Sequence, residues 1–139
     1  MTWLKEGAYE EYTIGKTRFS RGAADYSPSI YLGNALVFTS DRKESKGDDD
    51  KESAYQWTGR NFSDLFLVDL NTNDVTPFDG PINTGHNEGT AVFKKDFSEM
   101  YFIRCFGDED NKAFCKIMVS KKDGNSWSCL LYTSPSPRD

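Results

Sequence analysis

The feature that most constrains the fold of this chain is an internal repeat of short strand-like segments. Residues 36–38 match residues 100–102 at an offset of 64, and residues 19–22 match residues 82–85 at an offset of 63. The matching segments follow one another in the same order in both units. A repeat of this period, with several strands in each unit, is typical of β-propeller blades, which bury their faces only against neighbouring units.

The third strand of each unit aligns at a different offset. Residues 64–68 align with residues 115–119 at an offset of 51, which we attribute to a longer loop, residues 42–62, in the first unit. That loop has an acidic stretch at 43–52, and its counterpart is 107–112. Neither stretch has the ligand spacing of a calcium loop. We interpret both as solvated loops, and a cation site at 43–52 stays open as the alternative.

Eight segments are predicted to be strands, because β-branched and aromatic residues gather between clusters of Gly, Asn, Asp, Ser and Pro. They are 29–31, 35–40, 64–69, 75–78, 90–93, 99–104, 114–120 and 126–128, with hairpin turns at 32–34, 71–74 and 121–125. Helical periodicity is weak, and only residues 2–12 allow a short helix. The prediction is therefore an all-β fold, a partial β-propeller of about two four-stranded antiparallel blades. The blades span 19–81 and 82–128, within a propeller region of 19–128 that follows a lead-in over 1–18.

Composition and charge exclude several classes of function. A net charge of −5 gives the chain no electrostatic reason to bind nucleic acid. No apolar run approaches the roughly 20 residues of a membrane-spanning helix, and the first residues lack the pattern of a signal peptide. With three cysteines, no Cys-x-x-Cys pair and a single histidine, a zinc site is not expected. We expect no metal and no other cofactor.

No constellation of residues indicates catalysis. His86, the single histidine, lies in a predicted loop beside Asn87 and Glu88, and no serine stands in a nucleophile-elbow context. Glu88 followed by Gly89 is interpreted as a tight turn at the entry to a strand. A pair of carboxylates for glycoside hydrolysis would depend on a spacing that the sequence does not give. The chain is therefore predicted to carry no catalytic residue and not to be an enzyme.

Two groups of segments resemble a known family. Residues 25–29, 36–42 and 64–70 resemble the TolB-type, WD-like propeller repeat. Residues 82–89 and 100–105 resemble repeats in envelope proteins of Bacteroidota. Such proteins typically place the propeller before an OmpA-like peptidoglycan-binding domain, and some are linked to the type IX secretion machinery. The resemblance implies a periplasmic or outer-membrane-associated protein.

Two segments depart from the family pattern. At residues 94–98 the family usually has a Ser/Thr-x-Asp-Gly turn, and here Phe97 fills the glycine position. Residues 130–139 resemble translated sequencing-adapter DNA, so residues 129–139 are excluded from fold reasoning as an artefactual tail. A genuine Ser/Pro linker is the alternative.

Cys105 and Cys115 are the candidate disulfide. Cys105 follows the second predicted strand of the second unit and Cys115 lies in the third, so an antiparallel pairing brings them close together. In an oxidising compartment a disulfide would contribute on the order of 3 kcal/mol. Two free buried thiols are the alternative, and Cys129 has no predicted partner.

The leading hypothesis is a non-catalytic protein-binding scaffold in the bacterial cell envelope. Its partners would be other envelope proteins, with peptidoglycan bound only through an OmpA-like domain outside this chain. The alternative is the gating propeller of a hydrolase, either a peptidase or a sugar-processing enzyme, whose catalytic part also lies outside the chain. Two blades alone leave open faces, so the isolated chain is predicted to aggregate or to melt without cooperativity.

Overall fold

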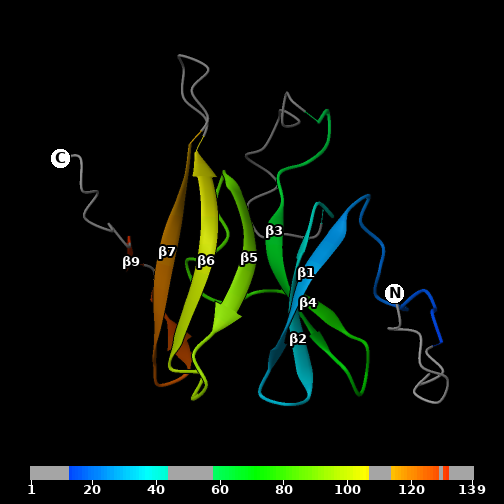
Figure 1. The fold of residues 1–139 in the computed structure, drawn as a ribbon, viewed down its shortest axis with the longest axis horizontal. Coiled ribbons are helices and arrows are strands. Elements are labelled where there is room, and N and C mark those ends of the chain that lie inside the picture. Colours follow the sequence, from blue (N-terminus) through cyan, green and yellow to red (C-terminus); the bar gives the residue numbers. More distant parts are fainter. Residues whose placement is uncertain (1–12, 44–57, 107–113, 129, 132–139) are drawn as a thin grey trace, which may run out of the picture.

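The structure is a computed structural model that describes residues 13–43, 58–106, 114–128 and 130–131. Within these residues the chain is all-β and contains no helix (Figure 1). The predicted helix at 2–12 and nearly all of the acidic stretches 43–52 and 107–112 lie outside the described residues. The all-β prediction is confirmed for the part that the structure describes.

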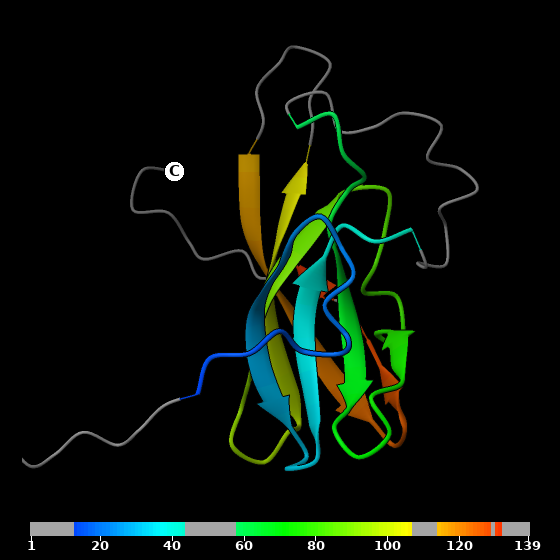
Figure 2. The ribbon, with the colours of Figure 1, turned by 90° about the vertical axis from the view of Figure 1, so that its right-hand side faces the viewer.

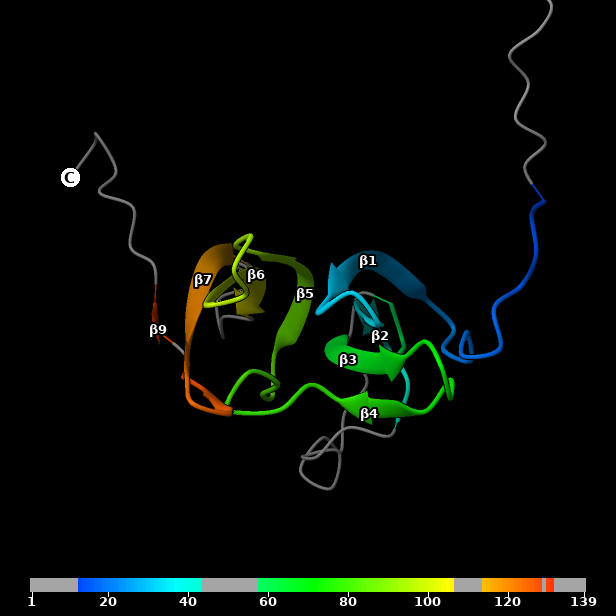
Figure 3. The ribbon, with the colours of Figure 1, turned by 90° about the horizontal axis from the view of Figure 1, so that it is seen from below.

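The strands form two antiparallel sheets, each a simple meander in chain order. The first sheet contains β1 (Asp25–Tyr31), β2 (Ala35–Ser40), β3 (Asp64–Asp69) and β4 (Val75–Pro77). The second contains β5 (Asn87–Phe93), β6 (Glu99–Phe106), β7 (Phe114–Asp123) and β8 (Ser126–Trp127), and the short β9 (Leu130–Leu131) pairs with β7. Figure 2 shows the first sheet nearly face on, and Figure 3 shows the second sheet curling from β5 towards β8.

The first strand of each sheet begins earlier than the sequence predicts, because each contains a β-bulge. The register shifts between Tyr26 and Ser29 in β1, and between Gly89 and Val92 in β5. Inside the bulges Ser27 has φ 51° and Thr90 has φ 54°. Positive φ at a residue other than glycine is typical of turns and bulges and not of a regular strand. The sequence analysis therefore missed the first residues of each strand, 25–28 in β1 and 87–89 in β5.

The strand registers correct one alignment of the repeat. Val37 pairs with Leu67 in the first sheet, and Tyr101 pairs with Val119 in the second. Since Tyr101 is equivalent to Val37, the third strands are related by an offset of 52, and the predicted offset of 51 is wrong. A shift of one residue exchanges the two faces of a strand, so the error would have reversed which side chains of β7 face the core.

The main core lies between the two sheets. Val37 and Leu65 of the first sheet pack with Met100, Phe102 and Met118 of the second, and all five are buried. Figure 3 shows β5 beside β1 at this junction, in agreement with the contacts between these strands. Polar groups join the sheets too: the Thr90 backbone N–H donates to Thr39 Oγ1 at 3.0 Å.

A smaller core lies on the opposite face of the first sheet. Phe38, Phe66 and Val68 are buried there, and Phe19 from the leading loop packs against them. The Phe19 and Phe38 ring centroids are 5.6 Å apart. Both faces of the first sheet are therefore apolar, as expected for a sheet buried on two sides.

The turn between β5 and β6 places a phenylalanine in a backbone conformation that glycine adopts most easily. Phe97 has φ 56°, and its backbone N–H donates to the Lys94 carbonyl at 2.8 Å. Its ring packs against Tyr31 of the first sheet, with centroids 5.5 Å apart. Contact between the sheets thus offsets the backbone strain of this position.

The end of the second sheet includes part of the predicted tail. Leu130 and Leu131 form β9, opposite Val119 and Met118 of β7. Residues 129 and 132–139 lie outside the described residues. The artefactual origin of the tail stays a prediction.

Candidate functional site: two equivalent buried ion pairs

A buried ion pair joins the first two strands of the second sheet. Arg104 on β6 donates from Nε to Oε1 of Glu88 on β5 at 2.8 Å, and from Nη2 to the Ile82 carbonyl at 2.7 Å. The Glu88 side chain is fully buried and that of Arg104 is 10% exposed. Thr84 donates to the same carboxylate from its hydroxyl at 2.5 Å and from its backbone N–H at 3.2 Å. The pair thereby ties the leading loop of the second unit to its sheet.

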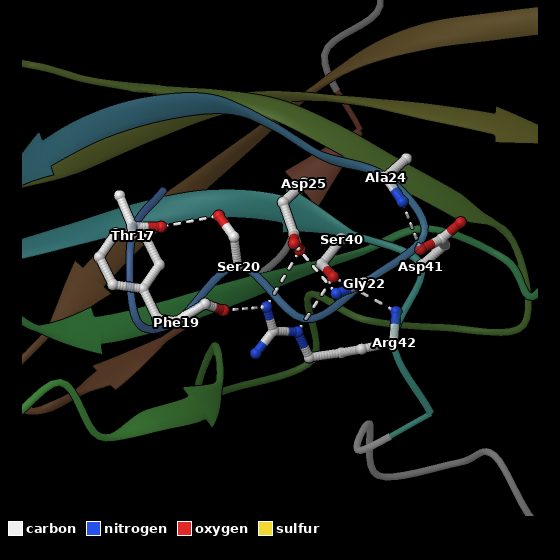
Figure 4. A network of polar contacts seen from close by, with 9 residues as sticks. All are labelled: Thr17, Phe19, Ser20, Gly22, Ala24, Asp25, Ser40, Asp41 and Arg42. Atoms are coloured by element: carbon white, nitrogen blue, oxygen red, sulfur yellow. Dashed lines mark hydrogen bonds and ion pairs between the residues drawn. The ribbon is translucent and has the colours of Figure 1, made fainter. Parts of the chain in front are cut away.

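The first sheet carries a matching pair, drawn in Figure 4. Arg42 donates from Nη2 to Oδ1 of Asp25 at 3.0 Å and to the Phe19 carbonyl at 2.8 Å. Its Nε donates to Ser40 Oγ at 3.0 Å. The Gly22 backbone N–H also donates to the Asp25 carboxylate, at 3.0 Å.

The two guanidinium groups occupy equivalent places in the two sheets, although Arg42 and Arg104 stand at different positions of the repeat. Phe19 and Ile82, whose carbonyls they bind, are 63 residues apart, as in the repeat. By strand register, however, Arg104 is equivalent to Ser40, which lies opposite Asp25 as Arg104 lies opposite Glu88. Arg42 follows Ser40 by two residues, and its side chain reaches back across that serine. Its Cζ atom lies 5.0 Å from the Phe38 ring centroid.

The two carboxyl groups have pKa values shifted in opposite directions. Burial disfavours the charged form of Asp25, but hydrogen bonds from Ser40 and Arg42 outweigh it and lower its pKa. For Glu88, burial dominates over the hydrogen bonds from Thr84 and the charge of Arg104. The charge of the nearby Asp64 raises the pKa further, and the pKa of Glu88 reaches about 7.

We expect the stability of the protein to fall as the pH rises from about 4.5 to about 7, because of Glu88. In that range the folded protein binds a proton that the unfolded chain, with the ordinary pKa of 4.5, has already released. Below and above the range both states carry the same charge at this position. The decrease should be about 3 kcal/mol, measured by urea denaturation at several pH values. Glu88→Gln should remove it, and an unchanged pH dependence in that variant would contradict the assignment.

The structure joins Cys105 and Cys115 as a disulfide, which links β6 and β7 at a directly opposed position of their register. Beyond the disulfide the two strands continue to Phe106 and Phe114, whose rings stack with centroids 5.3 Å apart. The disulfide lies on the same face of β6 as Ile103, which points away from the core. The oxidation state in the native compartment stays a prediction.

Thiol titration of the denatured, non-reduced protein is expected to detect one thiol per chain, that of Cys129, because the other two cysteines are paired. A Cys129→Ser variant serves as the control and should show none. Three thiols in the parent chain would contradict the disulfide.

The other residues singled out in the sequence lie apart from one another. The His86 ring is half-buried and packs against Phe106 with centroids 4.8 Å apart, although an exposed loop position was predicted. Glu88 is part of the buried ion pair, so its interpretation as a turn marker was incomplete. Among the described residues, no group of three or more His, Cys, Asp or Glu side chains is arranged to hold a metal ion. The described residues also contain no helix that is long and apolar enough to cross a membrane.

The ion pairs escaped the sequence analysis even though the sequence contained a signal for them. Acidic residues stand 63 positions apart at Asp25 and Glu88, within the repeat. The arginines break the offset, because Arg42 reaches its partner from two residues beyond the equivalent position. Alignment by residue type alone therefore could not pair them.

Comparison with known proteins gives no match for this chain, whether with protein-family models, with curated proteins or with solved structures.

Proposed function

We propose that the two sheets are consecutive blades of a β-propeller that serves as a non-catalytic protein-binding scaffold in the bacterial cell envelope. The proposal rests on one observation: the face of the first sheet that packs on the second sheet is equivalent to the exposed outer face of the second sheet. Stacking of this kind generates closed rings or open arrays, because the interface never pairs a face with itself.

The equivalent residues of the two sheets support this reading. Thr39 and Leu65 lie on the face of the first sheet that packs against the second. Their equivalents are Ile103 and Ile117, which pair across β6 and β7 as Thr39 and Leu65 pair across β2 and β3. Thr39 and Leu65 are fully buried, whereas Ile103 is 38% and Ile117 is 53% exposed. The second sheet thus presents an apolar face at the position where a further blade would pack.

The face of the second sheet that packs on the first sheet also has an apolar equivalent, on the far face of the first sheet. Met100, Phe102 and Met118 face the first sheet. Their equivalents, Leu36, Phe38 and Phe66, form the small core on the far face of the first sheet, against Phe19. The envelope location is supported by the resemblance of the repeats and by the disulfide, which is typical of proteins in oxidising compartments.

The chain is expected to self-associate in isolation, and Ile117→Lys is expected to reduce that association. A charge in the centre of the exposed face makes burial of that face unfavourable. Size-exclusion chromatography with light scattering would give the mass of both proteins. Lys95→Gln, in the turn between β5 and β6, is the control and should behave like the parent chain. A parent chain that is monomeric with a sharp two-state melt would contradict the blade assignment.

The function itself is tested by the reading frame around this chain. The scaffold proposal expects further units, each with a buried acid–arginine pair, and a peptidoglycan-binding domain. If a neighbouring segment of the reading frame encodes a strand-turn-helix with Gly-x-Ser-x-Gly, the scaffold proposal is wrong. The chain would then be the gating propeller of a peptidase.

A further inference from the structure

A pocket beside the first ion pair gathers three arginines. Arg18 and Arg21 come from the leading loop and Arg42 from the end of β2, and the turn between β3 and β4 closes the other side. Residues 13–24 contain Lys16, Arg18 and Arg21 and no acidic residue, in a chain whose net charge is −5. The fold brings Arg18 and Arg21 together with Arg42, which lies more than 20 residues further along the chain.

The buried arginine has hydrogen-bonding capacity left over. Nε and Nη2 of Arg42 donate to Ser40, Asp25 and Phe19, and Nη1 makes no hydrogen bond to the described part of the chain (Figure 4). The side chain is only 6% exposed, and its ion pair with Asp25 holds it in place. The guanidinium also lies over the Phe66 ring, with Cζ 5.1 Å from the centroid. A guanidinium that lines a pocket and is held in place by an ion pair is preorganised to donate to an anion.

The second unit shows what is specific to this pocket. The positions equivalent to Arg18 and Arg21 hold Pro81 and Thr84, and Thr84 donates to the Glu88 carboxylate. The repeat thus retains the buried guanidinium in both sheets but adds two exposed arginines in only one. Neither Arg18 nor Arg21 is a partner in the ion pair between Arg42 and Asp25.

We propose that the pocket lined by Arg18, Arg21 and Arg42 binds an oxyanion, either a carboxylate or a phosphate group. Arg42 supplies the fixed donor, and the exposed arginines supply charge that can close over the ligand. Asp74, exposed on the opposite wall, opposes the binding of an anion and limits its affinity. This inference does not depend on the blade assignment, since the pocket lies within the first unit.

The test is a titration of the full chain, with Ile117→Lys to limit association, with inorganic phosphate and, separately, with acetate, at constant ionic strength set with sodium chloride. The readout is the NMR shift of the Arg42 side-chain N–H and of the backbone amides of residues 18–22. Saturable shifts with both probes support a general oxyanion site. Saturation with phosphate alone or with acetate alone supports the site and identifies its ligand class. Shifts that do not saturate with either probe overturn the proposal.

Three variants distinguish a specific site from general charge effects. Arg21→Gln should weaken binding about fivefold and Asp74→Asn should strengthen it by a similar factor, as expected for one charge near the ligand. Lys95→Gln removes an exposed charge elsewhere and should change nothing. Opposite effects of the first two variants exclude damage to the fold as the cause. Equal weakening by Arg21→Gln and Lys95→Gln would overturn the proposal.

Discussion

Replacement of Arg104 by methionine is expected to lower the free energy of unfolding by about 3–5 kcal/mol at pH 8. Methionine keeps much of the volume of the side-chain stem, so packing changes little. It removes the guanidinium from Glu88, whose carboxylate is fully buried and 2.8 Å from Arg104 Nε. It also leaves the Ile82 carbonyl without its donor. A buried charge without its partner is among the most costly changes in a folded protein.

The pH dependence of this cost separates loss of charge from loss of packing. At pH 5 Glu88 is neutral in the folded protein, because burial raises its pKa to about 7. Arg104→Met should therefore cost clearly less at pH 5 than at pH 8. Urea denaturation at both pH values, with Ile117→Lys as the background to limit association, gives the comparison. An equal cost at the two pH values would contradict the role assigned to the charge of Glu88.

Arg42→Met is the matched control in the other sheet. It should cost about 1–3 kcal/mol, because Asp25 keeps a hydrogen bond from the Gly22 backbone N–H and is 10% exposed, so water can solvate part of its charge. The cost should not diminish at pH 5, since the pKa of Asp25 is lowered and the group stays ionised there. The two arginines, whose guanidinium groups occupy equivalent places, would then respond differently to pH.

Replacement of Phe102 by alanine is expected to lower the free energy of unfolding by about 3–5 kcal/mol. The Phe102 ring is 1% exposed in the core between the two sheets. Arg104 Cζ lies 5.5 Å from its centroid, so the variant also removes a cation–π contact. The cavity would lie at the junction on which both sheets depend.

The neighbouring residue provides the control. Ile103 points to the opposite face of β6 and is 38% exposed, so Ile103→Ala should cost less than about 1 kcal/mol. Both variants are compared by urea denaturation in the Ile117→Lys background. Similar costs at the two positions would contradict the register in which Phe102 and Met118 face the first sheet.

The strands were the most predictable part of the fold. Runs of β-branched and aromatic residues between turn residues located eight of the strands, including β2 and β3 with their exact bounds. The turn at 32–34 was equally clear, because Leu32 and Gly33 adopt positive φ between two apolar runs. Near the bulges of β1 and β5 the local pattern resembles a turn, and the predicted strands began late, missing residues 25–28 and 87–89.

The candidate site was less predictable, because its contacts join residues distant in sequence. Glu88 and Arg104 are separated by a bulge and a hairpin, and burial gives the pair its character. The pocket at Arg18, Arg21 and Arg42 depends on a loop folding back over the end of β2. The repeat spacing relates Asp25 to Glu88, but it does not show which arginine approaches either carboxylate.

The sequence by itself determined that the chain is β-rich, that it contains two similar units, and which cysteines can pair. Those properties follow from periodicity, turn chemistry and the order of segments along the chain. Only the tertiary structure decided the offset of 52 between the third strands, the equivalence of the two guanidinium groups, and which repeated face is buried or exposed. The physical reason is that a strand has a side-chain period of two. Its two faces are alternatives of nearly equal local energy until a second sheet packs against one of them.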